Sequence, residues 1–172
     1  MEQEKDIVCC PEMDENIFWR IIKNSQAQTS EVNRQFDRLG DILRGLSPLQ
    51  IVGFRLTMDR LFKKLGDAYL YWNPDELPED QRSSADDIKY LIISMGEFKY
   101  FEIRINPDKL YHPYYKDTWA LESVYLYGKL DCSSEIFQEK TGEDLDKFIE
   151  TYHRFEELEQ NEQQDHDQEM EQ

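Results

Sequence analysis

The sequence predicts a mostly α-helical protein, a single domain of about six helices around one long central helix. Apolar residues recur at spacings of three and four along most of the chain, which is typical of helices with one buried face. A length of 172 residues is enough for one domain with a substantial core, and no shift in composition marks a second domain. A minor β element near residues 100–105 is the one alternative, because the segment FEIRI alternates apolar and polar residues.

The central helix is predicted to span residues 47–72. Ser47 can cap its first backbone amides, and Pro48 suits the first helical position, where an N–H has no partner. Gly66 lies near the apolar face of this helix, and we interpret it as a place where another helix crosses closely, with a hinge as the alternative. The apolar stripe consists of Ile51, Phe54, Met58, Leu61, Leu65, Ala68 and Trp72.

Two shorter helices are predicted before the central helix. The first begins at Asp14 and ends near Ser25, and the second begins at Ser30 and ends at Gly45.

Three further helices are predicted after it. Residues 75–84 should form an exposed acidic loop, and a buried helix should follow from Ser84 or Asp86. Its apolar face is Ile88, Leu91, Ile92, Met95 and Phe98. Another helix is expected through Trp119 to about Gly128. A last helix, with a capping start at 141–144, carries Leu145, Phe148, Ile149, Tyr152 and Phe155.

The charge is unevenly distributed along the chain. The net charge of −17 divides into −5 for residues 1–15, −4 for 16–155 and −8 for 156–172. We therefore predict a flexible N-terminus over 1–13, a helical domain over 14–155 and an acidic disordered tail over 156–172. No basic stripe is available to displace counterions from phosphates, so direct nucleic-acid binding is disfavoured.

The sequence favours a cytoplasmic protein that does not enter a membrane. Its first residues, MEQEKDIVCC, carry acids where a secretory signal has a positive region. No apolar run approaches the 18 or so residues that a membrane span requires. Three cysteines, two of them adjacent, suit free thiols in a reducing compartment.

Residues 90–110, YLIISMGEFKYFEIRINPDKL, resemble the signature of a bacterial family catalogued as domain of unknown function 4240. The matching places are Leu91 to Ser94, Gly96, Tyr100, and Asn106-Pro107-Asp108 with Leu110. Other landmarks agree in order: Phe18-Trp19 with Ile22, Leu46-Ser47-Pro48 with Ile51 and Phe54, Ala68-Tyr69, and Thr141-Gly142.

The resemblance covers roughly residues 14–150 and implies a helical domain, with helix rather than strand over 97–105. It implies no function, since the family has none assigned. Members often carry a Gly-rich, Cys-Ser-Asp-Asp-type loop before the signature, whereas this chain has Glu79-Asp80-Gln81-Arg82-Ser83-Ser84.

Motifs for catalysis, metals and nucleotides are sparse. One interpretation makes Cys132 a nucleophile and His112 or His153 its base. The plainer interpretation is that Cys132 is a buried structural thiol. No Cys-x-x-Cys spacing, P-loop or Gly-x-Gly-x-x-Gly occurs. We therefore predict no cofactor, no metal site and no catalytic residues.

An aromatic cluster offers a candidate protein-binding surface. Tyrosine and tryptophan are enriched at interface hot spots, but the same rings can instead pack a loop onto the core. Both interpretations stay open for Tyr111, His112, Tyr114, Tyr115 and Trp119.

Paired acids extend this candidate surface. Glu79, Asp80, Asp86 and Asp87 can form a solvated acidic surface that attracts a basic protein partner. We therefore predict a non-enzymatic interaction module, either an adaptor or an immunity-like inhibitor. A hydrolase using such loop carboxylates, or a structural domain of a homo-oligomer, is the alternative; the sequence does not indicate an oligomeric state.

Overall fold

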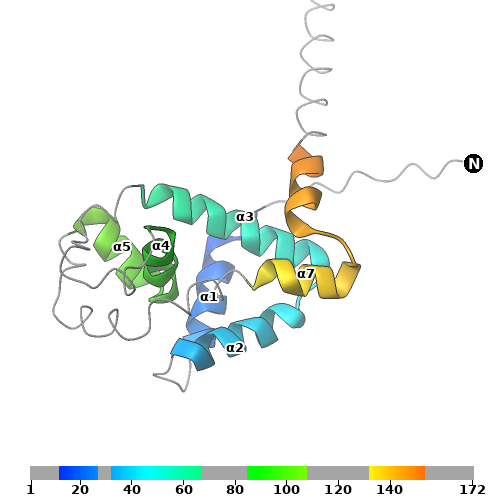
Figure 1. Ribbon diagram of the computed structural model, residues 1–172. Coiled ribbons are helices and arrows are strands. Elements are labelled where there is room, and N and C mark those ends of the chain that lie inside the picture. The colour runs from blue at the N-terminus through cyan, green and yellow to red at the C-terminus, as the bar shows by residue number, and fades with distance from the viewer. Residues whose placement is uncertain (1–11, 27–31, 67–84, 108–131, 154–172) are drawn as a thin grey trace, which may run out of the picture.

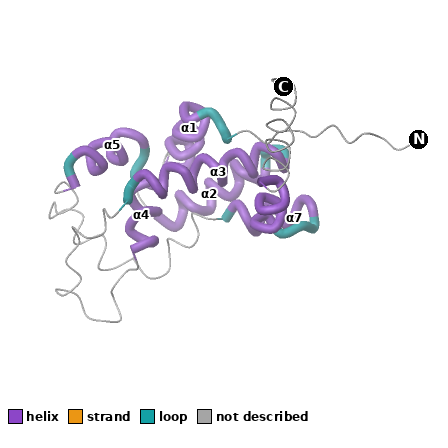
Figure 2. Tube along the Cα trace, turned by 90° about the horizontal axis from the view of Figure 1, so that it is seen from above, coloured by secondary structure: helices purple, strands orange, loops and turns teal. Residues whose placement is uncertain are grey.

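The computed structural model confirms the mostly α-helical fold. It describes residues 12–26, 32–66, 85–107 and 132–153. The described residues contain helices and no strands (Figure 2). None of these helices is long and apolar enough to cross a membrane.

Six helices have defined bounds, close to the predicted number. They are α1 (Glu15–Gln26), α2 (Val32–Arg44), α3 (Pro48–Lys64), α4 (Ala85–Ser94), α5 (Glu97–Ile105) and α7 (Ser133–Thr141). A further helical run occupies residues 145–153. The helix predicted from Trp119 to Gly128 lies outside the described residues.

All six helices contribute to one hydrophobic core. In Figure 1, α3 crosses above α1 and α2, with α4 and α5 at one end of it and α7 at the other. Aromatic rings join the helices in the middle: the rings of Phe18 and Phe54 stack with their centroids 4.9 Å apart. The largest fully buried side chains are Phe18, Ile22, Leu39, Leu43, Ile51, Phe54, Met58, Leu61, Ile92, Tyr100 and Phe137.

The start of α3 is confirmed, but its predicted end at Trp72 is wrong. The Ser47 hydroxyl accepts the Gln50 N–H, and the Gln50 side chain accepts the Ser47 N–H, so the helix begins with a full capping box. It ends at Lys64 because the chain turns at Gly66, whose φ is 54°. Gly66 is exposed, with no described atom within 4 Å of an ideal Cβ, so the predicted close crossing is also wrong.

The first two helices largely follow their sequence signals. The Asp14 carboxylate accepts the N–H groups of Asn16 and Ile17, which caps α1. α2 ends at Arg44, next to the predicted stop at Gly45. Its predicted cap, Ser30, lies outside the described residues.

Residues 85–105 differ from the prediction in two ways. The proposed β element at 100–105 is wrong because α5 covers it: Tyr100 and Ile103 are buried at helical spacing, while Ile105 is 83% exposed. A strand would have placed Ile103 and Ile105 on the same face. The predicted buried helix is also interrupted at Gly96, so Phe98 is 77% exposed and does not cover α3. Leu91 and Ile92 are buried as expected.

Arginines on α3 connect distant parts of the chain. The Arg55 guanidinium contacts Asp59 at 2.9 Å, the Ser134 hydroxyl at 3.1 Å and Asp146 at 3.3 Å. It therefore joins α3 to both C-terminal helices. Arg60 similarly pairs with Glu15 of α1 and with Glu12 just before it, so α3 is joined to the start of α1.

Candidate functional site

Most of the site residues predicted from the sequence cannot be placed. Glu79 and Asp80 lie outside the described residues. So do Tyr111, His112, Tyr114, Tyr115 and Trp119. Asp86 and Asp87 lie in the first turn of α4.

The corner between α4 and α5 is held by two glutamines. The Nε2 atoms of Gln26 and Gln35 donate hydrogen bonds to the Ser94 carbonyl oxygen, at 2.6 and 2.9 Å. This carbonyl belongs to the last residue of α4, where the helix itself supplies no partner. Two residues from the first two helices thus fix the end of the fourth.

The signature residues of this corner have clear physical roles. Gly96 has a φ of 92°, a conformation that side chains disfavour, and it allows α5 to start directly after α4. Four residues later, the Tyr100 hydroxyl donates a 2.8 Å hydrogen bond to the Leu61 carbonyl oxygen. Burial raises the pKa of Tyr100 to about 12. The signature therefore anchors α5 against the end of α3.

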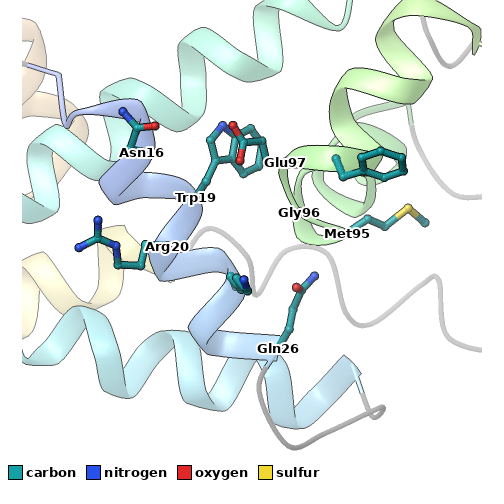
Figure 3. Close-up of a pocket in the computed structure, with 9 residues that line it drawn as sticks. Asn16, Trp19, Arg20, Gln26, Met95, Gly96 and Glu97 are labelled. Carbon is teal, nitrogen blue, oxygen red and sulfur yellow. The ribbon is translucent and has the colours of Figure 1, made fainter.

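A cleft of about 480 Å³ separates α1 from this corner (Figure 3). Trp19 is almost wholly buried beside it, and Gln26 extends from the end of α1 toward the corner. Arg20 extends from the side of α1 that faces away from the corner. The lining residues are Asn16, Trp19, Arg20, Lys23, Gln26, Met95, Gly96, Glu97 and Phe98.

The cleft offers an aromatic wall together with charges of both signs. Lys23 forms no ion pair with any described residue. Glu97 brings a carboxylate to the opposite wall. This lining suits the recognition of a group with mixed polar and apolar character.

The C-terminal helices are the most acidic part of the described structure. Residues 132–153 hold six acids and two lysines. All six acids are exposed: Glu135, Glu139, Glu143, Asp144, Asp146 and Glu150. We call these six residues the acidic C-terminal group. The sequence-based site did not include them, because exposed acids within helices are common and carry no specific signal.

The described part of the chain contains no group of three or more His, Cys, Asp or Glu side chains that could hold a metal ion. Cys132 is a half-buried cysteine just before α7, and His153 is exposed. The interpretation of Cys132 as a buried structural thiol is therefore only partly correct.

A family model matches residues 13–132, and its description is "protein of unknown function (DUF4240)". This chain belongs to that family. The match begins just before α1 and ends just before α7, so it includes the α4–α5 signature and stops before the acidic C-terminal group. No curated protein and no solved structure matched the chain.

In this DUF4240 chain, sequence reasoning missed the two glutamines of the corner. Gln26 and Gln35 bond to a backbone carbonyl 68 and 59 residues away. The sequence does not show which main-chain carbonyl accepts a side-chain hydrogen bond, so no local pattern could have paired these glutamines with Ser94. The Ser94 and Gly96 landmarks were the only indication that this corner is important to the fold.

Proposed function

We propose that this chain is a non-enzymatic interaction module, an adaptor or immunity-like inhibitor that presents an acidic surface to a basic protein partner in the cytoplasm. The observation that carries the proposal is the exposure of the acidic C-terminal group. The acidic tail over 156–172, with eight acids and no base, follows these residues in the sequence.

Most of these carboxylates are not neutralised within the described structure. Glu139 pairs with Arg44, and Asp146 with Arg55. The other four, Glu135, Glu143, Asp144 and Glu150, form no ion pair with a described residue. Their charges remain available to an approaching molecule.

Charges of this kind act mainly on the rate of association. Exposed acids produce a negative potential that extends about 10 Å at 0.1 M salt. A basic partner is drawn along this potential, whereas the lifetime of the complex depends more on contacts made after docking. We therefore expect fast, salt-sensitive binding.

The experiment is to capture a partner from lysate of the source cells, identify it, and measure its association rate with the purified proteins. The double variant Glu135→Gln/Glu150→Gln should slow association roughly three- to tenfold at low salt, and added salt should remove the difference. Asp37→Asn/Glu97→Gln changes the charge equally on other helices and is the matched control.

Equal slowing by both variants would show that only net charge matters, which would overturn the acidic C-terminal group as the binding surface. An association rate that is indifferent to salt would overturn the electrostatic proposal, as would failure to capture a basic protein.

A further inference from the structure

The helix α5 has apolar residues on two opposite sides. Tyr100 and Ile103 are fully buried in the core, while Phe98 and Ile105 are 77% and 83% exposed. Phe98 and Ile105 are seven residues apart, so they point within about 20° of the same direction. Phe101, between them on this side, is half-buried. We call Phe98, Phe101 and Ile105 the outer face of α5.

Large apolar residues on a second side of a helix are normally covered by another part of the protein or by a partner. The Lys99 ammonium lies 5.7 Å from the centre of the Phe98 ring and gives it one polar neighbour. Two large side chains on one helical face still leave a continuous apolar surface in water, which is unfavourable.

We infer that residues 108–131 of the same chain cover the outer face of α5. The chain leaves the described structure at Pro107, two residues after α5, and re-enters it at Cys132, next to α7. No other undescribed range starts so close to this face in the sequence. The inference is independent of the acidic partner, since it concerns different residues.

The length of this segment supports its role as a cover. The two views place α5 and α7 at opposite ends of α3. A chain of 24 residues can extend about 80 Å, whereas a domain of this size has a radius of gyration of about 15 Å. The segment is therefore much longer than a direct connection requires, and it has residues to spare for packing on α5.

The composition of the segment matches the surface it would cover. It contains five of the ten tyrosines of the chain and one of the three tryptophans. The family match over 13–132 also includes the whole segment, while it excludes the acidic tail. A segment this rich in aromatic residues and contained in the family unit suits a permanent part of the domain. In this arrangement the tyrosine-rich segment stabilises the fold, and the acidic C-terminal group is left to bind a partner.

A photo-crosslinking experiment on the purified full-length chain tests this inference. Phe98 is replaced by p-benzoylphenylalanine, and the crosslinked peptides are identified by mass spectrometry. We expect crosslinks within one chain to residues 108–131, with a yield that does not change on tenfold dilution. The same replacement at Ile105 should give the same result. Leu49, an exposed apolar residue at the start of α3, is the matched control and should not reach this segment.

Hydrogen exchange provides a second readout. Phe98→Ala should speed exchange of the amides in 108–131 about tenfold or more, while Leu49→Ala leaves them unchanged. Crosslinks to a second copy, crosslinks to other segments only, or no crosslinks at all from positions 98 and 105 would each overturn the inference. Unaltered exchange in Phe98→Ala would overturn it as well.

Discussion

Tyr100 combines complete burial of its ring with one well-placed hydrogen bond. The Leu65 N–H bonds to the carbonyls of Phe62 and Lys63, which leaves the Leu61 carbonyl in the last turn of α3 for the Tyr100 hydroxyl. The family landmark predicted that this aromatic residue matters. Its partner could not be predicted, because Leu61 contributes only a backbone atom from 39 residues away.

At the residue scale, we expect Tyr100→Phe to lower the free energy of unfolding by about 1 kcal/mol at pH 7, since one buried carbonyl loses its donor. The wild-type advantage should be lost as pH rises between about 10, where the unfolded tyrosine ionises, and about 12, the pKa in the folded chain. Burial, the main cause of the shift, penalises the phenolate and outweighs the opposing effect of Arg104.

Urea unfolding of both proteins from pH 7 to 12 measures this loss, with other ionisations cancelling in the difference. A difference between the two proteins that stays constant across this pH range would contradict the assignment. Ultraviolet titration should independently show one late tyrosine in the wild type that is absent from the variant.

Helix ends were predicted well where a side chain or a glycine supplies a local signal. Asp14, Gly45 and Ser47 all act at the ends of helices as their residue types suggest. The break at Gly96 was missed because apolar residues continue at helical spacing through it. Only the tertiary contacts of Tyr100 and Ser94 show that two helices meet there at a corner.

At the scale of elements, two glycines should respond in opposite ways to alanine. Gly40 lies inside α2, where an added Cβ would be 3.5 Å from an Arg44 nitrogen and 3.9 Å from an Ile136 carbon, both ordinary contacts. We expect Gly40→Ala to stabilise the protein by about 0.5–1 kcal/mol, because alanine loses less entropy in a helix. Gly96→Ala should destabilise it by about 1–2 kcal/mol, because alanine disfavours a φ of 92°.

Urea unfolding of the two variants provides a matched comparison, since both add one methyl group to a helical region. If Gly40→Ala destabilises the protein, α2 packs more tightly on α7 than the contacts indicate. If Gly96→Ala is neutral, the turn between α4 and α5 tolerates another conformation.

For the whole molecule, helical spacing predicted the class of fold and much of the core, but not which surfaces remain uncovered. Met58 and Leu61 are buried as their stripe indicates, while Phe98 is exposed although its spacing fits the same pattern as Leu91. Periodicity identifies apolar faces, but it does not show what lies against each one. The acidic C-terminal group was left out of the sequence-based site for a related reason, since only the fold shows which of its charges lack a described partner.

Arg55 joins α3 to the C-terminal helices through its contacts with Asp146 and Ser134. Its side chain is only 14% exposed, and it contacts Asp59 and Asp146. Burial raises the pKa of Asp59, and Arg55 opposes this effect without cancelling it. The Asp59 carboxylate is therefore sensitive to any loss of the guanidinium.

We expect Arg55→Met to destabilise the protein by about 2 kcal/mol at pH 7, because it leaves a partly buried carboxylate without its cation. A raised pKa favours the protonated acid in the folded state, so the contribution of Asp59 is most favourable at low pH and is lost as pH rises through its folded pKa. The loss caused by Arg55→Met should accordingly be smaller near pH 4. Adding Asp59→Leu to this variant should restore much of the stability, since the unpaired charge is gone.

Arg44→Met is the control: its pair with Glu139 is more than half exposed on both sides, and it should cost about 0.5 kcal/mol or less. Thermal and urea unfolding of the four proteins measure these differences, and equal losses for Arg55→Met and Arg44→Met would show that Arg55 does not hold the C-terminal helices to α3.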